Sequence, residues 1–126
     1  MTLNSDQTTN KVLIEKIAEI VGIDASWAIA VSMTESSLGL HRKSPTGARG
    51  LFQMTGIAMK DLLQEMENDD MVGSLCGIAF LWVLFKRHHS IDDATMKYCD
   101  PNDRHFYWDR VKTYMEELKK EKEIKP

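Results

Sequence analysis

Cysteine is scarce in this chain, and neither a disulfide-rich nor a metal-binding protein is indicated. The 126 residues include two cysteines, Cys76 and Cys99, which are too few to define a disulfide framework. The four histidines lack the spacing of metal ligands, because two of them are adjacent and would point apart on a helix. We therefore expect no metal and no cofactor. A cysteine nucleophile with a histidine as its base stays an alternative, although no known cysteine motif surrounds either residue.

Basic charge and long apolar runs are also limited. The net charge of −3 offers no concentrated basic face of the kind that nucleic acid requires, so we expect no nucleic-acid partner. The longest apolar run covers residues 71–85, whereas a helix needs roughly 20 residues to cross a bilayer. We expect this run to form a buried central helix and the chain not to be an integral membrane protein. A membrane-anchoring segment is the alternative.

The chain shows no internal repeat, no low-complexity linker and no convincing β-hairpin pattern. Residues 1–10 are polar, without a basic start or an apolar stretch, so no secretory signal is expected. Apolar residues recur instead at helical spacing along most of the chain. This pattern predicts an all-α fold in a single domain over residues 1–126, in which residues 119–126 form a frayed tail.

The most informative stretch that is present runs from residue 35 to residue 54. It begins on a helix in which four residues recur on one face, namely Ala28, Val31, Glu35 and Leu38. This face is expected to pack inward, where apolar surroundings favour a protonated carboxyl group over a charged one. Glu35 is therefore a candidate proton donor. A glutamate that reaches solvent, or pairs with Arg42 or Lys43, is the alternative.

A loop follows this helix. Residues 44–47, Ser-Pro-Thr-Gly, have the composition of a type I turn, with Ser first, Pro second and Gly fourth. Three apolar residues then return to the core around Gln53, namely Leu51, Phe52 and Met54. The helix and loop together place one carboxyl group close in sequence to neutral polar groups that can hold a substrate.

This combination resembles the soluble-type lytic transglycosylases of the lysozyme-like superfamily. Their signature is an E-S pair, a Ser after a short spacer, and then G-A-x-G-L-x-Q followed by an apolar residue. The chain has Glu35-Ser36, then Ser44, and G-A-R-G-L-F-Q-M at residues 47–54. A later family motif, A-x-x-Y-N-x-G, is half kept, because Ala94 and Tyr98 are present but Cys99 replaces the Asn and no Gly follows. This difference from the family motif affects the expected substrate contacts near Tyr98 more than the role of Glu35 as the acid.

The resemblance implies a lysozyme-like fold and the cleavage of peptidoglycan glycan strands between N-acetylmuramic acid and N-acetylglucosamine. Glu35 would protonate the glycosidic oxygen and then accept the proton of the C6 hydroxyl, which closes a 1,6-anhydro ring. Ser44, Gln53 and Tyr98 would bind the substrate. The expected protein is thus a glycan-cleaving lyase that works as a monomer without a cofactor.

Two other functions stay open. A muramidase of the same fold would admit water and would need a second carboxylate. A glycan-binding protein or virion structural component would keep the fold without turnover. Because peptidoglycan lies outside the cytoplasmic membrane and no signal is expected, we expect delivery to the periplasmic cell wall by a bacteriophage particle or a specialised secretion system.

Overall fold

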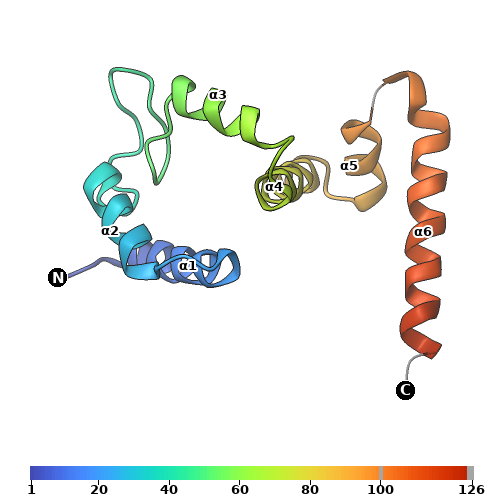
Figure 1. The fold of residues 1–126 in the computed structure, drawn as a ribbon, viewed down its shortest axis with the longest axis horizontal. Helices are drawn as coiled ribbons and strands as arrows, with labels where there is room; N and C mark the ends of the chain where they lie inside the picture. Colours follow the sequence, from blue (N-terminus) through green and yellow to red (C-terminus); the bar gives the residue numbers. More distant parts are fainter. Residues whose placement is uncertain (100, 125–126) are drawn as a thin grey trace. The chain divides into compact units, whose positions relative to one another are not determined.

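The computed structural model describes residues 1–99 and 101–124, which contain six α-helices, one short 3-10 helix and no β-strand (Figure 1). The all-α class is confirmed. The chain divides into two compact units, Met1–Val72 and Gly73–Pro126. The expected single lysozyme-like domain over residues 1–126 stays a prediction.

The N-terminal unit begins with α1 (Ser5–Val21), whose first turn is closed by a capping box. The Asn4 side chain accepts a hydrogen bond from the Gln7 backbone N–H at 2.8 Å, and the Gln7 side chain accepts one from the Asn4 N–H at 3.0 Å. At the other end Gly22 has φ +88°, and its N–H donates to the carbonyl of Ala18. Glycine takes this left-handed conformation without the cost that a Cβ would add.

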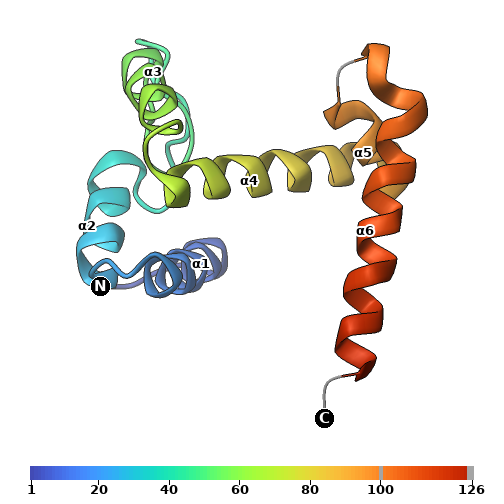
Figure 2. The ribbon, with the colours of Figure 1, turned by 45° about the vertical axis from the view of Figure 1, so that its right-hand side comes forward.

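Helix α2 (Ala25–Ser36) lies beside α1 (Figure 2). The Asp24 side chain caps it by accepting hydrogen bonds from the N–H groups of Ser26 and Trp27. The helix ends where Ser37 adopts a left-handed conformation, with φ +51°. The core of this unit lies between the two helices and the residues that follow α2, and it consists of Ile14, Ala18, Ala28 and Leu38.

The buried face of α2 differs from the expected one. Its buried residues are Ala28, Ser32 and Ser36, while Val31 is 36% exposed and Glu35 is also exposed. Ala28 and Leu38 are buried as expected, although Leu38 lies beyond the end of the helix at Ser36. The expectation was wrong for Val31 and Glu35, because Ser32 and Ser36 occupy the inward positions of the last turns. Serine can occupy the buried positions because each hydroxyl finds a hydrogen-bond partner there.

Helix α3 (Gly56–Glu65) completes the N-terminal unit, and Thr55 caps it by accepting a hydrogen bond from the Ala58 N–H. None of the α3 residues is buried. Helix α4 (Asp70–His88) begins in this unit and continues into the next.

The C-terminal unit contains most of α4, then α5 (Ile91–Tyr98), a 3-10 helix (Pro101–Asp103) and α6 (Arg104–Ile124). The Ser90 hydroxyl caps α5 by accepting a hydrogen bond from the Asp93 N–H. Helices α5 and α6 contact each other. Helix α6 continues to Ile124, because Lys and Glu are strong helix formers, and the fraying expected at 119–126 stays a prediction. Residues 125–126 lie outside the described residues.

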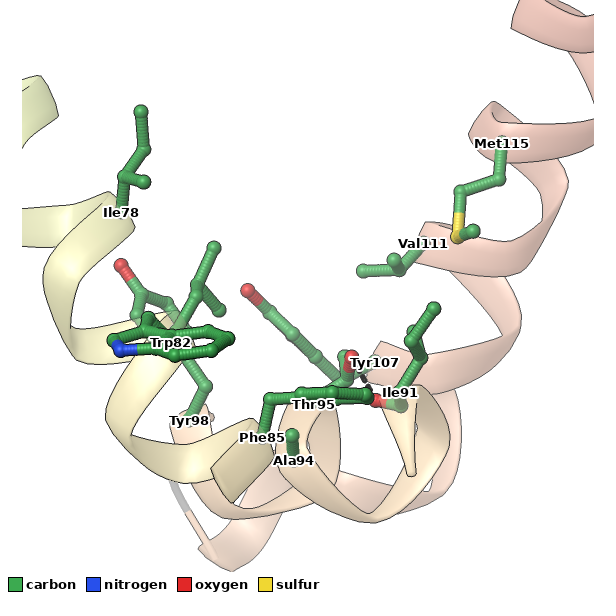
Figure 3. Close-up of a pocket in the computed structure, with 11 residues that line it drawn as sticks. Ile78, Trp82, Phe85, Ile91, Ala94, Thr95, Tyr98, Tyr107, Val111 and Met115 are labelled. Atoms are coloured by element: carbon green, nitrogen blue, oxygen red, sulfur yellow. Dashed lines mark hydrogen bonds between the residues drawn. The ribbon is translucent and has the colours of Figure 1, made fainter. Parts of the chain in front are cut away.

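The expectation that the apolar run forms a buried central helix was also wrong. Helix α4 has the expected position, but Leu84 is its only buried residue. Side chains of α5 and α6 face α4 across an apolar cavity of about 630 Å³ and leave its side chains accessible (Figure 3). By length and composition alone, α4 is the one helix in the described part of the chain that could cross a membrane.

Candidate functional site

The loop after Glu35 is held against the end of α2 by two buried hydroxyl groups. The Ser36 Oγ donates a hydrogen bond of 2.8 Å to the carbonyl of Leu51, and the Ser32 Oγ donates one of 2.9 Å to the same oxygen. Ser36 is 1% exposed and Ser32 is fully buried. Because one carbonyl oxygen has two lone pairs, it can accept both bonds. The loop is therefore fixed to the residue that follows the candidate acid.

A second set of bonds comes from α1. The Gln7 Nε2 donates to the carbonyl of Ser37 at 2.8 Å, and the Asn10 Nδ2 donates to that of Leu38 at 2.9 Å. These carbonyls follow the last turn of α2, where intrahelical partners are missing. The sequence interpretation missed Gln7 and Asn10. The available signal was their position on the same face of α1 as the core residue Ile14.

Within the loop, short backbone pairings create an ordered, non-helical structure. Arg49 forms isolated β-bridges with Lys43 and with Met54. The Arg49 N–H donates to the Met54 carbonyl at 3.2 Å, and the Met54 N–H donates to the Arg49 carbonyl at 3.0 Å. The turn expected at residues 44–47 is confirmed by a hydrogen bond of 3.2 Å from the Gly47 N–H to the Ser44 carbonyl.

The Ser44 hydroxyl is largely occupied by this turn. Its oxygen accepts hydrogen bonds from the N–H groups of Thr46 at 3.2 Å and Ala48 at 3.1 Å. It also lies 2.9 Å from the Thr46 Oγ1. A hydroxyl has two acceptor lone pairs and one proton, so only the proton is free to turn toward a ligand. Ser44 can therefore donate to a substrate oxygen in place of its contact with Thr46.

The Gln53 side chain is committed to the loop in a similar way. Its Nε2 donates to the carbonyl of Arg42 at 2.8 Å and to that of Gly50 at 2.9 Å. These two bonds use both amide protons and leave the Oε1 oxygen as an acceptor. Gln53 also has φ +48°, a left-handed conformation that is uncommon outside glycine. The geometry allows Gln53 to accept a hydrogen bond from a sugar hydroxyl while it holds the loop closed.

Glu35 lies on the exposed side of α2. Its carboxylate forms no hydrogen bond or ion pair with any described residue, and Arg42 and Lys43 do not pair with it there. We expected apolar side chains to surround this carboxyl group, but the described residues do not bury it. Ser32 and Ser36 occupy the inward positions of the last turns instead. Its carboxylate is accessible to a polymeric ligand.

Tyr98 belongs to the C-terminal unit. Its ring centroid lies 5.6 Å from that of Phe80 and 6.5 Å from that of Tyr107, and both pairs are tilted. Tyr98 lines the apolar cavity together with Trp82 and Phe85, as Figure 3 shows. The structure thus places Ser44 and Gln53 in one loop and fixes that loop to the helix of Glu35. Tyr98 lies in a different unit, and its participation in a common site stays a prediction.

Neither cysteine forms a disulfide, and the Cys99 thiol donates a hydrogen bond to the Met96 carbonyl at 3.2 Å. Cys99 is buried. Among the described residues, no group of three or more His, Cys, Asp or Glu side chains is placed to hold a metal ion.

No protein-family model, no curated protein and no solved structure matches this chain.

Proposed function

We propose that the chain is a lytic transglycosylase that cleaves peptidoglycan, with Glu35 as its general acid and base. The observation that supports this best is the attachment of the loop to the end of α2 through Ser36 and Leu51. It fixes the two polar side chains of the motif, Ser44 and Gln53, to the helix that carries the carboxyl group. A site of this kind needs a fixed spacing between the acid and the groups that orient the sugar.

The exposure of Glu35 in the free chain fits a large polymeric substrate. A glycan strand that covers the carboxyl group would replace its water with sugar rings, and desolvation favours the protonated acid. We therefore propose that the substrate itself completes the poorly solvated surroundings that the acid needs. This differs from the expectation that the helix alone buries the carboxyl group.

The proposed reaction uses one carboxyl group twice. Protonated Glu35 gives its proton to the glycosidic oxygen as the bond from that oxygen to the muramic acid C1 breaks. The carbonyl oxygen of the substrate's own N-acetyl group stabilises the positive charge at C1. The Glu35 carboxylate then takes the proton of the C6 hydroxyl, whose oxygen bonds to C1 and closes the 1,6-anhydro ring. Glu35 ends protonated, no water is consumed, and no second carboxylate is needed.

The remaining hydrogen-bonding capacity of the loop suits the orientation of this substrate. Gln53 keeps one acceptor oxygen, which can receive a sugar hydroxyl, and Ser44 keeps one proton, which can reach an N-acetyl carbonyl. Each residue therefore has a single role toward a ligand while its other groups maintain the loop.

Glycan binding without cleavage is the second candidate. The exposure of Glu35 and the absence of a partner for its carboxylate among the described residues favour it, because nothing there holds the carboxyl group in position toward a glycosidic oxygen. In that case the loop would bind sugar, and the substitution of Glu35 would leave binding intact.

Mass spectrometry of the products from purified peptidoglycan sacculi distinguishes these functions. The wild type is compared with Glu35→Gln and with Glu19→Gln, which removes another exposed glutamate from the same unit. Products ending in 1,6-anhydro-muramic acid, present with Glu19→Gln and absent with Glu35→Gln, support the proposal. Reducing ends would identify a muramidase instead, and sacculus binding without soluble products would identify a binding protein.

A further inference from the structure

Helix α4 carries a continuous apolar surface that its own unit does not cover. Ile78 is 66% exposed and Trp82 is 59% exposed, and the remaining large apolar residues of the helix are also accessible, apart from Leu84. No charged residue lies between Asp70 and Lys86. Contiguous exposed apolar surfaces of this kind mark sites of interaction with a partner or a membrane.

The two ends of this surface differ in charge. The last turn of α4 contains Lys86, Arg87 and His88, whereas the first turn contains Asp70. The Lys86 ammonium group lies 5.6 Å from the centroid of the Trp82 ring. Trp82 thus lies one turn before the basic residues of the helix end. Tryptophan, lysine and arginine are all found where a helix meets the headgroup region of a bilayer, because each side chain has an apolar body and a polar end.

The cavity beside α4 is a further apolar feature at the same end of the helix. It holds about 630 Å³ and is lined by Trp82 and Phe85 of α4 and by residues of α5 and α6 (Figure 3). Its lining is almost entirely apolar, and it is open to the exterior. The basic end of α4 therefore adjoins an apolar space that hydrocarbon can enter.

We propose that the C-terminal unit binds the surface of an anionic phospholipid bilayer. The apolar face of α4 lies at the boundary of the acyl chains, and Lys86 and Arg87 contact the lipid phosphates. The basic side chains in the last turn of α4 complement the negative headgroups of the lipid. This inference is independent of the proposed glycan chemistry, because it uses none of the residues of the loop site.

The length of the apolar run favours a position at the surface over one across the bilayer. The run at residues 71–85 rises by about 22 Å at 1.5 Å per residue, which is less than the hydrocarbon thickness of about 30 Å. Asp69 and Asp70 would also be repelled by the anionic leaflet. The basic end of α4 is thus the end that we expect to approach the lipid.

Sedimentation with lipid vesicles tests this proposal on the full chain. Vesicles of phosphatidylglycerol and phosphatidylcholine in equal parts are compared with vesicles of phosphatidylcholine alone, at low and at high salt. We expect binding to the anionic vesicles, little binding to the neutral ones, and weaker binding at high salt.

Two double variants test whether the basic end of α4 is the part of the chain that contacts the lipid. Lys86→Glu with Arg87→Glu is expected to lower the partition coefficient by roughly thirtyfold or more, since each basic residue contributes about fivefold. Lys119→Glu with Lys120→Glu changes the net charge equally on an exposed part of α6 and is expected to bind far better than the first pair. Equal losses in the two double variants would overturn the assignment to α4.

Fluorescence reports whether the apolar face enters the lipid. Vesicles should shift the tryptophan emission to shorter wavelength in the wild type and in Trp27→Phe, while Trp82→Phe should lose most of the shift. Absence of binding to anionic vesicles by folded protein would overturn the proposal. A stable dimer in solution that Ile78→Glu converts to a monomer would assign the same surface to a second copy of the chain instead.

Discussion

The side-chain hydroxyl of Ser36 donates a hydrogen bond of 2.8 Å to the backbone carbonyl of Leu51, which lies fifteen residues further along the chain. The same oxygen of Ser36 accepts a hydrogen bond from the Gly39 N–H at 3.0 Å. One buried hydroxyl therefore closes the end of α2 and attaches the loop to it. The structure gives this serine a role in positioning the loop.

Replacing Ser36 by alanine should destabilise the loop by about 1–2 kcal/mol, because it removes one bond to the partly buried Leu51 carbonyl and one cap of the helix end. Hydrogen exchange at the N–H groups of Arg49 and Met54, which pair across the loop, measures this directly. The matched control is Thr34→Ala, whose hydroxyl bonds only to the carbonyl of Ala30 on the exposed side of the helix. Similar effects of the two substitutions would contradict the proposed attachment.

Gln53→Glu should open the loop more than Gln53→Ala does. The Gln53 Nε2 donates to the carbonyls of Arg42 and Gly50, and a carboxylate would put acceptors against both oxygens. We expect a loss of protection from hydrogen exchange at residues 49–54 that is larger for the isosteric glutamate than for alanine. The reverse order would mean that the amide makes little contribution to loop structure and is free to bind a ligand.

The ends of several elements can be predicted from local signals in the sequence. Gly22 ends α1, Asp24 caps α2 and Ser90 caps α5, and each of these depends on a side chain or glycine within a few residues of the helix end. The turn at residues 44–47 is local in the same sense. Such features are predictable because no distant contact is needed to decide them.

The buried faces of the helices were not predicted, since they depend on contacts that are distant in sequence. Periodicity placed Glu35 inward, but the hydrogen bonds from Ser32 and Ser36 to Leu51 bury the serines instead. An apolar composition also implied that α4 would be buried, although composition measures only how apolar a helix is and not what covers it. The hydrogen-bond partner of a serine hydroxyl and the side chains that pack over a helix both depend on the tertiary structure.

Gly39→Ala and Gly47→Ala should differ in cost, although both glycines have a left-handed backbone. Gly39 has φ +97°, and a Cβ there would lie 2.8 Å from the Arg42 Nη2 and 2.9 Å from the Asn10 Nδ2. Asn10 cannot move without losing its hydrogen bond to Leu38. Gly47 has φ +91° with no atom within 4 Å of such a Cβ.

We expect a cost of about 2–4 kcal/mol at Gly39, where strain and crowding add, and about 1–2 kcal/mol at Gly47, where only strain applies. Urea denaturation of the two variants, followed by hydrogen exchange of the core amides of Ile14 and Ala18, compares them. Equal costs would show that the side chains around Gly39 yield without penalty.

Substitutions of Tyr98 separate the role of its hydroxyl from that of its ring. Tyr98→Phe keeps the ring contacts with Phe80 and Tyr107, so stability should change by less than about 0.5 kcal/mol. Tyr98→Leu removes both aromatic contacts and should cost about 1–2 kcal/mol. The hydroxyl has no hydrogen-bond partner among the described residues and is therefore available to a ligand.

If the hydroxyl orients the glycan, Tyr98→Phe should lower the rate of release of anhydro products from sacculi by about three- to tenfold, which corresponds to one hydrogen bond. Tyr114→Phe on the exposed face of α6 provides the control for loss of a phenol elsewhere in the same unit. Full activity in Tyr98→Phe combined with lost activity in Tyr98→Leu would assign the tyrosine to packing. In that case the half-kept second motif would contribute to the structure of the C-terminal unit, and substrate recognition would depend on the loop that contains Ser44 and Gln53.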